Sequence, residues 1–266
     1  MLIDTHAHLN FKDFDDDRDE IINRCLKNDI FVINIGTDLE SCKKAIEIAE
    51  KYERGVYATV AMHPHNIELG PDKSFAFRRV ADLAKSAKVV AIGECGLDYE
   101  FCENDIEAQK KQQEIFIQYL KLAQEVNKPI IIHSRRLFPE ILQIIQTTNY
   151  KLQNTAPGVL HCYMGRWSYA EEYLKLGFYL SFTGLITYAR DYDKVIKNCP
   201  LDRILIETDS PYMIPKPFRK KDEIIRNTPL NIEFVAKKIA EIKELSFEEV
   251  AEQTTKNAQE LFNLVI

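Results

Sequence analysis

The chain has 266 residues, enough for one large domain or two small ones. Apolar residues make up 45%, aromatic residues 10% and charged residues 29%, which excludes a chain that is disordered throughout. The formal net charge of −6 excludes a uniformly basic surface, although bound cations or a local basic patch can still meet a polyanion.

The sequence predicts a cytoplasmic protein with no membrane span. No apolar run approaches the roughly 18 residues that a membrane helix needs. The first ten residues, MLIDTHAHLN, lack the basic and apolar regions of a signal peptide. Six scattered cysteines include no CxxC pair, so we expect reduced, mostly buried thiols.

Eight short apolar runs recur along the chain and are rich in Val, Ile and Leu, which is typical of buried parallel strands. They cover residues 2–6, 31–36, 56–62, 89–94, 129–133, 158–161, 178–184 and 203–209. Successive runs start roughly 20 to 40 residues apart, the length that a strand and its crossover helix need.

Amphipathic patterns predict helices at 16–28, 105–127, 231–244 and 247–263. Ser246 is the expected N-cap of the last helix, and Glu249 completes a capping box. The segment 210–230 contains four prolines and is expected to be a loop after the eighth strand.

This alternation predicts an α/β fold, a (β/α)₈ TIM barrel with an extra C-terminal helix, as one domain over residues 1–266. A doubly wound open sheet is the alternative. It usually carries a Gly-rich first turn, and no GxGxxG follows residues 2–6.

All six histidines lie at or just after the C-terminal end of a predicted strand. Because these ends open on one face of a barrel, where barrel active sites form, the imidazoles are expected to converge. Carboxylates lie at the ends of the fourth and eighth strands. Such a set suits a divalent cation such as zinc, manganese or iron(II). The residues are His6, His8, His63, His65, His133, His161, Glu94, Asp98, Glu207 and Asp209.

Six or seven ligands are too many for one cation, so the pattern predicts two metal sites that share a ligand. Glu94 is the expected bridge, because a carboxylate can bind two cations and its strand lies between the two ligand groups. Such a pair can lower the pKa of a shared water toward about 7 to 9 and clamp a phosphoryl or carbonyl oxygen. A serine nucleophile is disfavoured, since no GxSxG is present. Cys95 and Cys162 adjoin ligands and are expected to pack.

Seven blocks occur in order: DTHAHLN at 4–10, MHPHN at 62–66, GECGLDY at 93–99, IIIHSR at 130–135, HCYMG at 161–165, SFTGLITY at 181–188 and ETDSPY at 207–212. Together they resemble the TatD-type metal-dependent deoxyribonucleases of the amidohydrolase superfamily. The resemblance extends from residue 4 to about residue 262. It implies hydrolysis of DNA phosphodiesters, in some members as 3′-to-5′ exonucleases.

The resemblance also implies a ligand set. His6 and His8 would bind the first metal with Glu94 and Asp209. Glu94 would bridge to the second metal. His133 and His161 would complete that second site. The two expected cofactors are divalent ions, Zn²⁺, Mg²⁺ or Mn²⁺, and the expected partner is DNA, single-stranded or at duplex ends.

Further residues near the predicted mouth have two interpretations. His63 and His65 either hold a substrate phosphate, with His63 also assisting proton transfer, or they hydrogen-bond to the ligands. Arg135 is expected to clamp a phosphate, because its guanidinium is planar and bidentate. Asp98 is either a metal ligand itself or a structural partner of a ligand histidine. The basic run at 216–221 either faces solvent or binds the DNA backbone.

Glu207, Asp209 and His63 form the expected catalytic set, with Glu207 as a general base or as a ligand of a further ion. The chain departs from the family at Glu100, where an aromatic residue is usual, and in a lengthened loop at 215–229. Two other functions stay open. One is a small-molecule amidohydrolase or lactonase, and the other is a non-catalytic metal-binding barrel.

Overall fold

The computed structural model describes residues 1–67, 73–100, 102–153, 155–220, 223 and 225–265. Eight parallel strands form one sheet in the order of the sequence, from β1 to β8. They are β1 (Leu2–Ala7), β2 (Ile30–Ile35), β3 (Val56–Val60), β4 (Val89–Leu97), β5 (Ile130–Ser134), β6 (Gly158–Leu160), β7 (Tyr179–Phe182) and β8 (Ile204–Ile206).

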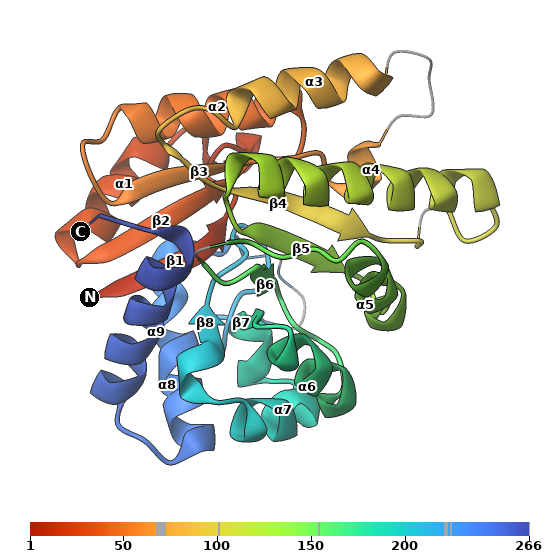
Figure 1. Ribbon diagram of the computed structural model, residues 1–266. Coiled ribbons are helices and arrows are strands. Elements are labelled where there is room, and N and C mark those ends of the chain that lie inside the picture. The colour runs from red at the N-terminus through yellow and green to blue at the C-terminus, as the bar shows by residue number, and fades with distance from the viewer. Residues whose placement is uncertain (68–72, 101, 154, 221–222, 224, 266) are drawn as a thin grey trace.

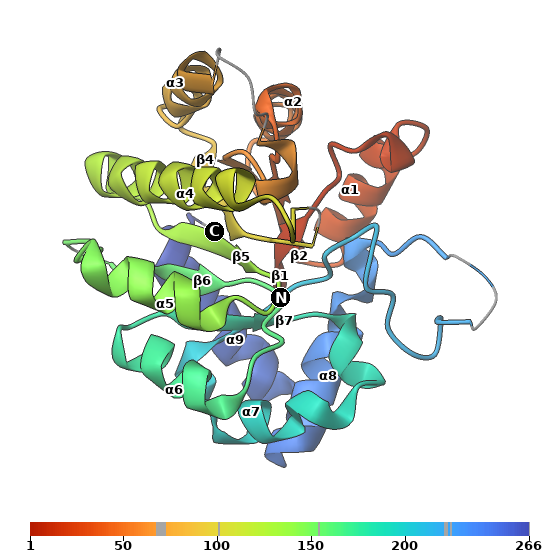
Figure 2. The same ribbon diagram turned by 90° about the vertical axis from the view of Figure 1, so that its right-hand side faces the viewer.

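Helices follow the strands and form a ring around them (Figures 1 and 2). The α-helices are α1 (Arg18–Lys27), α2 (Leu39–Glu50), α3 (Lys73–Leu83), α4 (Ile106–Val126), α5 (Phe138–Thr147), α6 (Trp167–Lys175), α7 (Asp193–Asn198), α8 (Ile232–Lys243) and α9 (Phe247–Phe262). Short 3₁₀ turns are η1 (Lys12–Phe14), η2 (Pro64–Asn66), η3 (Gly184–Thr187), η4 (Arg190–Tyr192), η5 (Leu201–Arg203) and η6 (Pro229–Asn231).

Backbone hydrogen bonds between β1 and the segment after β8 close the barrel. The Asp209 N–H donates to the carbonyl of His6 at 2.9 Å, and the His8 N–H donates to the carbonyl of Ser210 at 2.8 Å. Ala7 and Ser210 form a parallel bridge between the same two segments. The predicted (β/α)₈ barrel is therefore confirmed.

Apolar side chains from every strand fill the barrel interior, as in other barrels of this size. They include Ile3, Ile33, Tyr57, Ala91, Ile131, Val159, Tyr179 and Leu205. Leu261 and Phe262 of α9 belong to the same cluster, so the extra C-terminal helix packs against the interior. A larger apolar core lies between the strands and the surrounding helices.

Three of the four predicted helices have nearly the expected ends, whereas α1 begins two residues later than predicted. The observed α4, α8 and α9 agree with the predicted ranges to within one residue at each end. At the start of α9 the Ser246 hydroxyl accepts from the N–H of Glu249, and the Glu249 carboxylate accepts from the N–H of Ser246, which confirms the capping box. In the described part of the chain, no helix combines the length and apolarity needed to cross a membrane.

The predicted ends of β3 and β7 lie two residues beyond the observed ones, and those of β4 and β8 were wrong by three residues. β4 continues three residues past Glu94, because Cys95–Leu97 pair with β5. β8 ends at Ile206, not Asp209, whose φ of 52° lies in the left-handed region and cannot continue a strand. Glu207 and Asp209, two residues apart, therefore do not lie on one face of a strand, as a strand over 203–209 would have placed them.

Irregular pairing aims the site residues into the barrel mouth. The register of β1 against β2 shifts between Asp4 and Ala7, and that of β4 against β5 shifts between Ile92 and Cys95. Such shifts reverse which side chains face inward, and they commonly occur beside active sites. His6 in β1 and Glu94 in β4 lie within these two stretches.

Candidate metal centre

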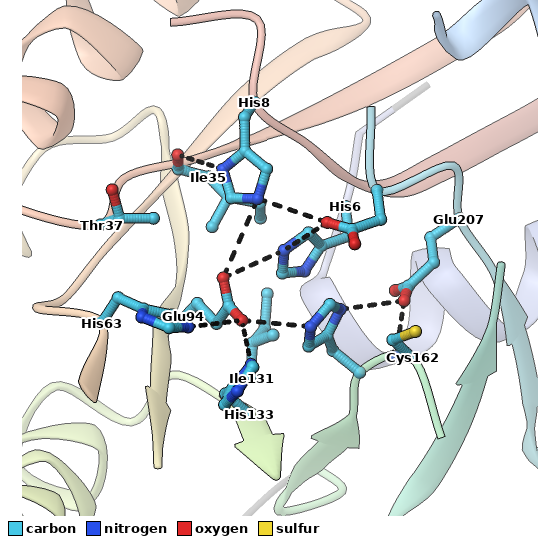
Figure 3. A network of polar contacts seen from close by, with 12 residues as sticks. His6, His8, Ile35, Thr37, His63, Glu94, Ile131, His133, Cys162 and Glu207 are labelled. Atoms are coloured by element: carbon cyan, nitrogen blue, oxygen red, sulfur yellow. Dashed lines mark hydrogen bonds and ion pairs between the residues drawn. The ribbon is translucent and has the colours of Figure 1, made fainter. Parts of the chain in front are cut away.

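Histidine rings from four strand ends surround the carboxylate of Glu94 (Figure 3). On one side of it lies the pair from β1. The Glu94 Oε2 atom is 3.3 Å from Nε2 of His6 and 3.9 Å from Nε2 of His8. Asp209 approaches the same two rings, with its Oδ1 3.8 Å from His6 Nε2 and 3.4 Å from His8 Nε2. These four residues form the first half of the centre.

The other carboxylate oxygen faces a different group of rings. The Glu94 Oε1 atom is 2.7 Å from Nδ1 of His133 on β5 and 3.1 Å from Nε2 of His161 after β6. It is also 3.5 Å from Nε2 of His63, which follows β3. The two oxygens of Glu94 therefore face separate nitrogen groups, which is the arrangement that a carboxylate bridging two cations requires.

The donor set fits divalent cations. The described residues include three possible ligand groups, and within each group the ligand atoms lie within 4.8 Å of one another. The groups are His6, Glu94 and His161; His6, His8 and Asp209; and His63, Glu94 and His133. Among the described residues, neither ring nitrogen of the fully buried His6 has a hydrogen-bond partner. An unsatisfied buried imidazole is costly, and ligation of a cation would satisfy it. Imidazole and carboxylate together suit borderline divalent metals.

Carboxylates behind two of the rings orient them. Oδ2 of Asp98 lies 3.3 Å from Nε2 of His133 and 2.7 Å from Nε2 of His65. Oε1 of Glu207 lies 3.0 Å from Nδ1 of His161. A carboxylate that accepts from the far nitrogen of a ligand histidine fixes the ring and raises its basicity. Asp98 and Glu207 are therefore placed to support the ligands.

Charge around the centre is strongly coupled. Burial alone would raise the pKa of Glu94, but the charges of the surrounding histidines hold it well below its usual range. Burial alone would lower the pKa of His161, but the carboxylates of Glu94 and Glu207 raise it well above its usual value. Burial lowers the pKa of His6 and of His63, which favours their neutral forms.

Arg135, which was expected to clamp a phosphate, forms an ion pair with Glu100. Both terminal nitrogens of Arg135 lie 2.8 Å from the carboxylate oxygens of Glu100. The two side chains are 49% and 46% exposed, so the pair lies at the surface. His65 is 31% exposed and contacts Asp98, which makes it a support for the His133 ring as well as a candidate for substrate contact.

Arg226, at the end of the long loop, faces inward. Its guanidinium contacts the Asp17 carboxylate, with one pair of atoms 2.9 Å apart, and lies 4.7 Å from the ring centre of Phe14. Asn227 beside it is fully buried, and its amide donates to the carbonyl of Thr208 at 3.0 Å. These contacts fasten the end of the loop to the barrel, and they make Arg226 a structural residue.

Other cations of the loop are also partnered. Arg219 lies over the ring of Tyr188, 4.2 Å from its centre, and Lys220 is 2.7 Å from the Glu223 carboxylate. Lys221 lies outside the described residues. The loop thus offers a DNA backbone fewer available cations than its sequence suggested.

A buried polar contact between β1 and the segment after β8 was missed by the sequence reasoning. Asp4 is fully buried and accepts from the N–H and the hydroxyl of Thr208 and from the N–H of His6. Thr208 lies between Glu207 and Asp209, so this contact holds the turn that carries both. The available signal was Asp4 itself, an acidic residue within a strand predicted to be buried.

Comparison with known proteins agrees with this geometry. A family model described as TatD related DNase matches residues 3–263. An uncharacterized metal-dependent hydrolase, YabD of Bacillus subtilis, is 39% identical over 267 residues, 99% of this chain and 100% of that protein. The 3′-5′ ssDNA/RNA exonuclease TatD of Cronobacter sakazakii is 34% identical over 248 residues, 90% of this chain and 89% of that protein. The crystal structure of YJJV, a TatD homolog from Escherichia coli K12, superposes with a TM-score of 0.87 at 29% identity, covering 99% of this chain and 98% of that one.

Proposed function

Because the chain belongs to the TatD-related DNase family and is a metal-dependent hydrolase, we propose that it hydrolyses DNA phosphodiester bonds at a site for two divalent cations. His6, His8 and Asp209 would hold the first cation. His133 and His161 would hold the second. Glu94 would bind both.

The arrangement of Glu94 carries this proposal. Its Oε2 faces His6 and its Oε1 faces His133, at 3.3 Å and 2.7 Å. A single cation would need only one of these oxygens together with one set of rings. The pKa of Glu94 lies well below its usual range despite complete burial, so the carboxylate is ionised and ready to ligate at neutral pH.

Two bound divalent cations would lower the pKa of a coordinated water and neutralise charge on the phosphoryl oxygens. Other residues of the chain hold the metal-ligating side chains in position. Glu207 accepts a hydrogen bond from His161 and another, at 2.7 Å, from the backbone N–H of Cys162. The second contact holds the carboxylate in place, and the first positions the His161 ring. We assign Glu207 to that role ahead of general base. Asp209, which lies beside both β1 histidines, is the carboxylate that we propose accepts a proton from the water.

The proposed substrate is a DNA strand cleaved from its 3′ end. Support comes from the family and from the Cronobacter relative, whose name describes a 3′-5′ exonuclease acting on ssDNA and RNA. Arg135, two residues after His133, would leave its ion pair with Glu100 and contact a phosphate beside the scissile one. A cytoplasmic location is part of the same proposal.

The test uses protein stripped of metal and then reloaded with Mg²⁺, Mn²⁺ or Zn²⁺ separately. Each form is assayed on single-stranded and duplex oligonucleotides labelled at the 5′ end, on a simple phosphodiester ester, and on a lactone and a cyclic amide. We expect a ladder of products shortened from the 3′ end, which a 3′-terminal phosphorothioate blocks. The metal-free protein and the His8→Ala variant are the controls.

Two results would overturn the proposal. Turnover of the lactone or amide with no cleavage of any phosphodiester would assign the site to the small-molecule hydrolases. Equal DNA cleavage by metal-free and metal-loaded protein would remove the cations from the reaction.

A further inference from the structure

Partners of the histidine rings determine which nitrogen of each ring carries a proton. A carboxylate or carbonyl oxygen can only accept a hydrogen bond, so a ring nitrogen facing it is protonated. A backbone N–H can only donate, so a ring nitrogen facing it must present its lone pair. A neutral imidazole has one nitrogen of each kind. Fixing one nitrogen therefore fixes the other.

Three of the rings have an acceptor behind them. His8 Nδ1 lies 3.4 Å from the carbonyl oxygen of Ile35, His133 Nε2 faces Asp98, and His161 Nδ1 faces Glu207. The near nitrogens of His133 and His161 also face Glu94, 2.7 Å and 3.1 Å away, so in the metal-free protein these two rings can carry both protons. Once a cation takes the near side, the proton that remains in each ring is the one on the far side. The nitrogen directed at the centre is then free to give its lone pair to a cation.

His63 has the opposite arrangement. Its ring caps the 3₁₀ turn η2, and its Nδ1 accepts the backbone N–H of His65 at 3.2 Å. The Nδ1 atom must therefore present its lone pair, and the proton of the neutral ring is on Nε2. That Nε2 is the atom directed into the centre, 3.5 Å from Glu94 Oε1 (Figure 3). A protonated nitrogen cannot ligate a cation.

We infer that His63 is a hydrogen-bond donor aimed into the centre, and that it is not a ligand of a third cation, although it lies in the group with Glu94 and His133. With Glu94 Oε1 engaged by a cation, the Nε2–H of His63 would be available to donate to a non-bridging oxygen of a phosphoryl group bound at the centre. This second half rests on the proposed function, whereas the tautomer does not.

Local sequence supplies the cause. Pro64 follows His63 and starts the turn that brings the His65 N–H back onto the imidazole. The backbone of His63 is held at the same time, because its own N–H donates to the carbonyl of Thr37 at 2.8 Å. The donor is thus fixed in direction before any substrate binds, which is the condition for effective electrostatic stabilisation.

Nitrogen-15 NMR of the zinc-loaded protein tests the tautomer directly. We expect the His63 ring to give a protonated Nε2 and an unprotonated Nδ1, whereas His161 gives the reverse. The His63→Gln variant assigns the signals. An unprotonated Nε2 on His63 in the metal-loaded protein would overturn the inference.

Metal content gives an independent readout. Elemental analysis after dialysis should find the same number of ions in His63→Ala and His63→Gln as in the unmodified protein. His161→Ala, which removes a ligand, should hold fewer. Loss of an ion from both His63 variants would make His63 a ligand and overturn the inference.

Binding of inorganic phosphate and hydrolysis of a phosphodiester test the second half. We expect His63→Ala to weaken phosphate binding to the metal-loaded protein about tenfold, and to lower kcat about 10²- to 10³-fold. His63→Gln, which returns an N–H donor near the position of Nε2, should recover part of both. If the unmodified protein cleaves no phosphodiester, the proposed function fails while the NMR and metal results still decide the tautomer. Unchanged phosphate affinity in His63→Ala would overturn the donor role.

Discussion

Arg135 and Glu100 form a two-point ion pair beside the metal centre, each terminal guanidinium nitrogen 2.8 Å from a carboxylate oxygen. Arg135 follows His133 by two residues, and Glu100 follows Asp98 by two, so the pair continues the two strand ends that carry these site residues. The Glu100 carboxylate contacts the two guanidinium nitrogens with which Arg135 could otherwise bind a phosphate.

Glu100→Gln should therefore strengthen DNA binding. The exposed pair is worth at most about 1 kcal/mol, so removing it should lower KM for an oligonucleotide by up to about fivefold. Steady-state kinetics at low salt measure the effect. The matched control is Glu103→Gln, which removes a nearby charge without touching Arg135. The gain should vanish in Glu100→Gln/Arg135→Ala, and a gain that persists there would mean that general charge, not Arg135, is responsible.

Replacing Glu94 should cost more metal than replacing His161. Glu94→Ala removes an oxygen from each cation and leaves their mutual repulsion unscreened, whereas His161→Ala removes one nitrogen from one cation. We expect Glu94→Ala to retain less than about one ion per chain and His161→Ala to retain about one. Elemental analysis after dialysis gives both values, with Glu103→Ala as the control. Equal loss in the two variants would argue against the bridge.

Metal binding should strengthen as pH rises through the raised pKa of His161. In the metal-free protein, this raised pKa contributes stability that is present below the ordinary value of about 6.5 and is lost as pH rises through the folded value. A cation must displace that proton, so it binds better once the proton has left. The rise in Tm produced by a fixed zinc concentration should therefore grow as pH rises above the ordinary histidine value of about 6.5.

The Glu207→Gln variant supplies the matched test of this pH dependence. It removes one of the two carboxylates that raise the pKa of His161 and keeps an oxygen for the Cys162 N–H. The increase in metal-induced Tm should then occur at lower pH. An unchanged profile would assign the proton to another group.

The convergence of the candidate ligands could be predicted from sequence because they occupy strand ends, and the topology of a parallel barrel brings those ends together; their role as ligands stays a prediction. The Arg226 contact with Asp17 could not, since the course of a long loop depends on contacts with distant segments. Asp209 lies beside the β1 histidines as expected, but in a turn after β8 and not at the end of the strand. Its left-handed backbone could not be predicted from the neighbouring residues. That residues 1–266 form a single domain stays a prediction.

Asp4→Asn should remove a pH-dependent loss of stability. Burial raises the pKa of Asp4 to about 8, well above the 3.8 of an unfolded chain. Between about pH 4 and pH 8 the folded state therefore holds a proton that the unfolded state has lost, and folding becomes less favourable as pH rises, by up to about 1.4 kcal/mol per pH unit. Asparagine does not titrate. Its oxygen can still accept from the backbone of Thr208 and of His6, while its amide can donate to the Thr208 hydroxyl if that hydroxyl turns toward Ser210, 2.8 Å away.

The free energy of unfolding of metal-free protein, measured with urea at pH 5 and at pH 8, decides this. We expect Asp4→Asn to lose less stability than the unmodified protein between the two pH values. Asp4→Ala, which leaves the Thr208 donors unpaired in the interior, should be destabilised at both by about 1–3 kcal/mol. If Asp4→Asn and the unmodified protein lose stability in parallel, Asp4 is ionised in the folded state across this range, and its three donors outweigh its burial.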